Sequence, residues 1–132
     1  MRYALLNLLA CPMCKHFPLK LYVFEKSTIN KEFDVATPFC DVYCGLKAEF
    51  LEKINKDEIN CSECVKIDII SGIIVCPKCG RWYPIIDGIP WMYPDNMRRH
   101  QRIRSKEADF IKRYKEKIPN ELLSIISKYL EE

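Results

Sequence analysis

Two cysteine pairs of identical spacing stand far apart in this chain: Cys11 and Cys14, then Cys76 and Cys79, each with a proline after the first cysteine. This spacing lets each pair form a knuckle, a tight turn that aims two thiolates at one point. Two knuckles supply the tetrahedral sulfur set that a structural zinc ion prefers. Because four thiolates leave no position for water or substrate, we expect this zinc to stabilise the fold and to take no part in catalysis.

A second set of four cysteines lies between the two knuckles: Cys40, Cys44, Cys61 and Cys64. We expect a helix over 39–54, which would project the first two of them from one helical face. These four cysteines have three possible states. They could bind a second zinc ion, form two disulfides between the two pairs, or remain free buried thiols.

Other chemistries find little support. A redox Cys-x-x-Cys normally opens a helix in a βαβ setting, which this chain lacks. His16 and His100 are not followed by the residues that a zinc deaminase needs, and we expect both at the surface. No glycine-rich phosphate loop or Ser/His/Asp set is present. We therefore expect no catalytic residue in this chain.

The composition is that of a globular protein, with 48% hydrophobic and 30% charged residues among 132. No apolar run approaches the roughly 20 residues of a membrane span, and no signal peptide precedes Cys11. We therefore expect a cytoplasmic protein, where cysteine pairs more often bind metal than form disulfides. Many charged residues and a single glutamine, Gln101, suggest a thermophilic source, in which intracellular disulfides do occur.

The expected fold class is α+β: a zinc-ribbon-like small β-sheet domain built from 1–27 and 65–97. Ordinary ribbons place about 15–20 residues between their pairs, but 61 residues separate Cys14 from Cys76. The excess predicts an inserted helical lobe at 28–64. A basic helical extension over 98–132 follows, with a net charge of +4 against −1 for 1–97.

The pattern of apolar residues predicts the elements of the ribbon. We expect a short helix over 3–9, a strand over 18–25, and a hairpin over 65–75 that turns at Ser71-Gly72. Asp87-Gly88 predicts a second hairpin within 81–92. Pro84 and Pro90 lack an N–H group, so we expect these segments at a sheet edge. A basic helix over 98–117 and a last helix from Asn120 complete the chain.

The segment after the second knuckle is unusually apolar, and we expect a small ribbon to leave part of it exposed as a protein-binding surface. The predicted partner-binding residues are Trp82, Tyr83, Ile85, Ile86, Ile89, Pro90, Trp91 and Met92.

The stretch 98–106 contains no acidic residue. Its basic residues are candidates for contact with an RNA backbone, against the alternative of a solvated helix face. These candidates are Arg98, Arg99, Arg102, Arg104 and Lys106.

The runs 5–12 and 72–92, above all Gly80-Arg-Trp-Tyr-Pro-Ile-Ile-Asp-Gly-Ile-Pro90, resemble the archaeal type of the multifunctional methyltransferase activator subunit family. Members are small zinc-ribbon partners of tRNA, rRNA and release-factor methyltransferases. The resemblance implies a non-catalytic subunit and zinc on the first quartet. It also implies that 83–92 adds to the edge of the sheet of a class I methyltransferase, which itself binds S-adenosylmethionine. The alternative function is a free-standing zinc-ribbon module that binds RNA.

Overall fold

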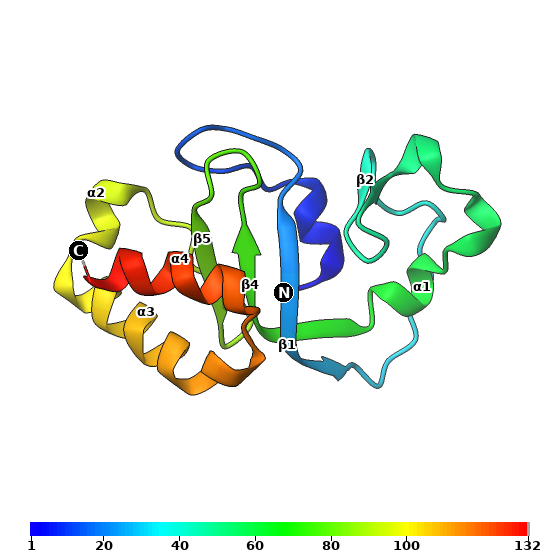
Figure 1. The fold of residues 1–132 in the computed structure, drawn as a ribbon. Coiled ribbons are helices and arrows are strands. Elements are labelled where there is room, and N and C mark those ends of the chain that lie inside the picture. Colours follow the sequence, from blue (N-terminus) through cyan, green and yellow to red (C-terminus); the bar gives the residue numbers. More distant parts are fainter. Residues whose placement is uncertain (132) are drawn as a thin grey trace.

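The centre of the molecule is an antiparallel four-stranded sheet in the order β1-β4-β5-β6, in a computed structural model that describes residues 1–131 (Figure 1). The strands are β1 (Lys20–Thr28), β4 (Ile67–Val75), β5 (Trp82–Ile86) and β6 (Ile89–Pro90). A one-turn 3₁₀ helix, Tyr3–Asn7, precedes the first knuckle. The mixed helix-and-sheet class expected from the sequence is confirmed.

Strand β4 runs without a turn, so the hairpin predicted at Ser71-Gly72 is wrong. Gly72 pairs with Val23 of β1 and with Ile85 of β5. A Cβ atom at Gly72 would lie 2.3 Å from the carbonyl oxygen of Tyr22. The glycine therefore serves the close approach of two strands, next to an irregularity in the β1–β4 register.

The hairpin predicted at Asp87-Gly88 is confirmed, since β5 and β6 pair on either side of it. Asp87 and Gly88 have φ angles of 50° and 79°, the left-handed values that a tight two-residue turn requires. Pro84 lies in β5, an interior strand, while Pro90 lies on the edge strand as expected. The carbonyl of Pro84 accepts the N–H of Trp91 at 2.8 Å. The N–H and C=O groups of a strand residue point to the same side. The main chain of Pro84 therefore faces β6, and its missing N–H group removes no hydrogen bond to β4.

The sheet is covered on both faces. Ile74, Tyr83 and Ile85 pack with Met1, Tyr3, Leu6 and Tyr43, while Ile73 and Trp82 pack against the C-terminal helices on the other face. Successive strand residues point to opposite faces. This explains why β5 is apolar throughout and β4 is apolar at six of its nine positions, as is usual for strands buried on both sides.

The C-terminal extension is part of the core. It contains α2 (Asp95–Arg98), α3 (Gln101–Tyr114), a 3₁₀ turn (Lys115–Lys117) and α4 (Asn120–Glu131). Its buried residues Phe110, Ile111, Tyr114, Ile118, Leu122 and Ile126 pack against the sheet. Figure 1 shows the helices on the side of the sheet opposite the N-terminal turn. Within residues 1–131, no helix is both long and apolar enough to span a membrane.

The helix predicted over 39–54 is wrong. The segment forms a small hairpin of β2 (Tyr43–Cys44) and β3 (Glu49–Phe50), followed by 3₁₀ turns at Leu51–Lys53 and Lys56–Glu58 and by the short helix α1 (Cys61–Cys64). Gly45 is buried against the carbonyl oxygen of Tyr3, 2.3 Å from where a Cβ would lie. Ala48 has a φ angle of 54°, outside the helical region. The helix-like spacing instead reflects Tyr43 and Phe50, which meet edge to face across the hairpin.

Candidate metal centre and sheet edge

The two knuckles have the same backbone construction. In the first, the N–H of Lys15 bonds the carbonyl of Cys11, and in the second the N–H of Gly80 bonds the carbonyl of Cys76, both at 2.9 Å. Lys15 and Gly80 have positive φ angles of 66° and 77°. Lys15 thus adopts the left-handed conformation that glycine adopts in the second knuckle. This conformation costs a residue with a Cβ about 1–2 kcal/mol.

The four sulfur atoms of the knuckles converge. Their Sγ atoms all lie within 4.8 Å of one another. Cys11 and Cys79 are 3.7 Å apart, and Cys14 and Cys76 are 3.4 Å apart. A tetrahedral zinc ion with Zn–S bonds of about 2.3 Å places its sulfurs about 3.8 Å apart. The four cysteines that the sequence predicted as zinc ligands therefore fit such an ion, which would cross-link the start of the chain to the root of β5.

Two neighbouring side chains support the thiolate form of this cluster. Burial raises the pKa of Cys11, but the N–H groups of its own turn and the hydroxyl of Tyr83, 3.3 Å from its Sγ, outweigh burial and lower the pKa to about 6. Burial likewise acts to raise the pKa of Cys79, and Arg81 lowers it. By contrast, burial raises the pKa of Cys76 to about 12. Zinc binding to the metal-free protein must therefore displace a proton from Cys76.

Arg81 and Asp95 link the second knuckle to the start of α2. The guanidinium donates to both carboxylate oxygens, with the shortest contact at 2.7 Å. The side-chain bond from Arg81 lowers the pKa of Asp95. Sequence reasoning missed this pair and also the role of Tyr83. The residues of each contact are far apart in the sequence, and a single sequence contains no pattern that pairs them. Neither contact could therefore have been predicted.

The predicted partner surface divides into buried and accessible parts. Trp82 is 2% exposed, and Tyr83 and Ile85 are fully buried. These three residues were predicted to bind a partner but are core residues instead, because the C-terminal helices cover one face of the sheet and the N-terminal turn covers the other. Ile89 is 61% exposed, whereas Ile86, Pro90, Trp91 and Met92 are half-buried. Within the segment 82–92, the accessible apolar surface is thus confined to the edge of the sheet around β6.

The basic residues of 98–106 also differ in their exposure to solvent. Arg98, predicted as an RNA contact, is 1% exposed and pairs with the buried Glu107 at 2.8 Å. Its guanidinium lies over the rings of Trp82 and Tyr129, at 4.8 and 4.6 Å from their centroids. It is therefore a core residue and unavailable to RNA.

Arg104 donates to the backbone carbonyl of Tyr129 and is half-buried. Arg99, Arg102 and Lys106 remain exposed. The side chains that could contact RNA are therefore fewer than the basic stretch suggested.

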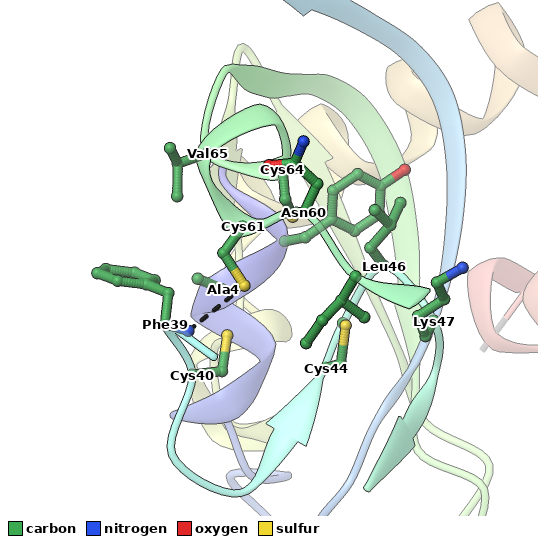
Figure 2. A pocket seen from close by; sticks show the side chains of 13 residues that line it. Ala4, Phe39, Cys40, Cys44, Leu46, Lys47, Asn60, Cys61, Cys64 and Val65 are labelled. Atoms are coloured by element: carbon green, nitrogen blue, oxygen red, sulfur yellow. Dashed lines mark hydrogen bonds between the residues drawn. The ribbon is translucent and has the colours of Figure 1, made fainter. Parts of the chain in front are cut away.

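The second cysteine quartet is assembled by β2, the loop before it and α1. Cys40, Cys44, Cys61 and Cys64 all line one cavity (Figure 2). All four are free thiols, and the structure does not draw their sulfurs together as closely as those of the first quartet. Burial raises the pKa of Cys64 to about 11, and its three neighbouring cysteines contribute.

The family of the chain is shown by comparison with family models. The model described as Trm112p-like protein matches residues 2–88, which include both knuckles, the segment 28–64 and the β5–β6 turn. The chain belongs to the Trm112p-like family. Trm112p-like proteins are methyltransferase activators, and membership implies a regulatory role and methyltransferases as partners. No curated protein matches the chain. The match ends before α2, so the helices that cover Trp82 lie outside the part that the family shares.

Proposed function

We propose that this chain is a non-catalytic subunit that stabilises and activates class I S-adenosylmethionine-dependent methyltransferases acting on tRNA, rRNA or release factor. It would bind them as a heterodimer, and S-adenosylmethionine would be held by the partner. The observation that carries the proposal is the combination of the family match with a four-thiolate cluster at the root of β5. Such a cluster has no open coordination position, so it suits a structural role.

The edge of the sheet at β6 supports docking through main-chain pairing. The N–H of Trp91 faces inward to Pro84. Because main-chain groups alternate in direction along a strand, the carbonyl of Pro90 faces away from β5. Beside it, Ile89 offers an exposed apolar side chain. An unpaired edge with an exposed hydrophobic residue is the arrangement to which another sheet adds a strand.

The zinc cluster would determine the geometry of this edge. Cys79 and Trp82 are three residues apart, and Arg81 ties the knuckle to Asp95 beyond β6. A metal ion on the knuckles would therefore hold both ends of the β5–β6 segment. Metal binding would affect methylation only indirectly, through the position of the edge.

Co-expression with a class I methyltransferase from the same source tests the proposal. We expect a one-to-one complex by native mass spectrometry, and we expect Ile89→Glu to weaken it at least tenfold, since a charge would be buried in an apolar contact. The matched control is Ile125→Glu, because Ile125 is half exposed on α4, outside the family match. It should leave the complex intact.

The outcomes separate the function from the docking mode. If the unmodified chain neither forms a complex with any class I methyltransferase of its source nor raises its activity, the proposed function is wrong. If the complex forms and Ile89→Glu leaves its dissociation constant unchanged, the subunit role stands and the edge-strand docking is wrong.

A further inference from the structure

The second cysteine quartet lies in the inserted lobe, away from the cluster described above. Cys40 precedes β2 and Cys44 ends it, while Cys61 and Cys64 are the first and last residues of α1. Two segments separated by 16 residues are thus brought to the wall of one cavity. Cys44 and Cys61 are buried, and Cys40 and Cys64 are half-buried.

The size of the cavity limits what can occupy it. Its volume is about 30 Å³, close to the share of one water molecule in the liquid. An organic ligand needs a pocket roughly ten times larger. Most of the other lining side chains are apolar, among them Tyr3, Phe39, Leu46 and Val65. The side chains of this lining that commonly bind zinc are the four cysteines.

One backbone N–H group is already directed at a sulfur of the quartet. The backbone N–H of Phe39 donates to the Sγ of Cys61 at 3.4 Å (Figure 2). Figure 2 also shows the sulfurs of Cys40 and Cys61 pointing toward each other across the cavity. The spacings, three residues between the first pair and two between the second, lie within those usual for zinc ligands.

The lobe has little regular secondary structure, and several of its apolar side chains are exposed. Its strands are two residues long, and Phe39, Val42 and Leu46 are 49%, 52% and 42% exposed. Small units with little buried apolar surface usually require a disulfide or a metal to fold. A metal ion held by the four cysteines would supply such a staple.

We propose that Cys40, Cys44, Cys61 and Cys64 bind a second zinc ion, independent of the first, that holds the inserted lobe together. The sulfurs are more widely spaced than in the first quartet. Metal binding would therefore draw the loop at 39–40 toward α1 and couple occupancy to the ordering of the lobe. Each thiol that enters the site loses a proton to the solvent, and no oxidant or reductant is needed.

The test begins with zinc content and mass. Native mass spectrometry and elemental analysis of the purified full chain should give two zinc ions per chain and a polypeptide mass with all eight thiols reduced. One zinc per chain with reduced thiols would overturn the proposal. A polypeptide mass about four units low, two for each disulfide, would overturn it equally.

Variants assign the second ion to the quartet. Cys40→Ser/Cys64→Ser should hold one zinc, and Cys14→Ser/Cys79→Ser should hold the other one. The matched control Ser62→Ala, on α1 between the two ligands, should keep two. Two zinc ions in the Cys40→Ser/Cys64→Ser protein would contradict the assignment.

A labelling experiment covers the case in which a variant does not fold. Iodoacetamide should leave all eight cysteines of the zinc-loaded chain unmodified, and a chelator should expose the quartet to alkylation, as mapped by peptide mass spectrometry. Rapid alkylation of Cys40 and Cys64 in the loaded chain would contradict the proposal, because zinc-bound thiolates are protected.

Discussion

The buried pair of Arg98 and Glu107 provides the sharpest test of how the C-terminal helices are held on the sheet. The two side chains are 2% and 0% exposed, and Nε lies 2.8 Å from Oε2. Tyr129 donates a further bond to the other carboxylate oxygen at 3.2 Å. The pair joins α2 to α3 beneath the aromatic rings that cover Arg98.

Replacing Arg98 with methionine would keep apolar packing and leave Glu107 buried without its cation. Removal of one partner of a buried ion pair costs about 3–5 kcal/mol. For a denaturation slope of about 2 kcal/mol per molar urea, the midpoint should fall by about 2 M. We expect Arg98→Met/Glu107→Leu to recover most of the loss, since an apolar pair of similar volume avoids both desolvation costs.

The loss should depend on pH in a defined direction. Burial raises the pKa of Glu107, and Arg98 opposes this rise, so the pKa should rise further in Arg98→Met. A carboxyl group whose pKa is higher in the folded state retains its proton there when the unfolded chain has lost it. The protonated carboxyl therefore contributes stability that is fully present below the pKa of the unfolded chain, about 4.3. This contribution is lost as the pH rises through the raised pKa of the folded state. The cost of Arg98→Met should be largest at pH 8 and smaller toward pH 5.

Urea denaturation followed by tryptophan fluorescence at fixed zinc concentration measures these effects. Arg99→Met makes the same change at an exposed neighbouring position, and should shift stability by no more than about 0.5 kcal/mol. A loss below about 1 kcal/mol for Arg98→Met at pH 8, or a loss that grows toward pH 5, would refute the reasoning.

Three further predictions concern the ribbon. Chelation of zinc should collapse the thermal unfolding transition measured by circular dichroism, because structural zinc contributes about 10–16 kcal/mol of apparent binding free energy; an unchanged transition would show that the knuckles hold without metal. Gly72→Ala should destabilise the sheet by at least 3 kcal/mol, because its Cβ would meet the carbonyl of Tyr22 at 2.3 Å. Gly80 has open space around it and a φ of 77°, so Gly80→Ala should cost only about 1–2 kcal/mol. Equal losses of the two variants in urea denaturation would contradict this account. Asp95→Asn should cost only about 0.5–1 kcal/mol at neutral pH, because its pair with Arg81 is one-third exposed, and a loss above 2 kcal/mol would show a larger structural role.

Local chemistry determined much of this protein from the sequence alone. A Cys-x-x-Cys knuckle and an Asp-Gly turn are each built by a few adjacent residues, so their spacing predicted both the convergence of the four knuckle cysteines and the β5–β6 hairpin. The alternation around Leu21 and Val23 predicted β1 for the same reason. The 61-residue gap between the knuckles predicted an insertion, and the last helix was predicted to begin at Asn120, where α4 begins.

Only the tertiary structure decided which surfaces each element buries. The sequence predicted that part of the apolar segment around Trp82 would be exposed, and that Arg98 would contact RNA or solvent. Trp82 was misread because the helices that cover it come roughly 30–50 residues later in the chain. Arg98 was misread because the rings of Trp82 and Tyr129, from earlier and later in the chain, cover it. Gly72 and Gly45 likewise serve close contacts with Tyr22 and Tyr3 rather than a turn or a helix. Contacts between distant segments leave no periodic trace in one sequence, and it is these contacts that decide what remains exposed for a partner.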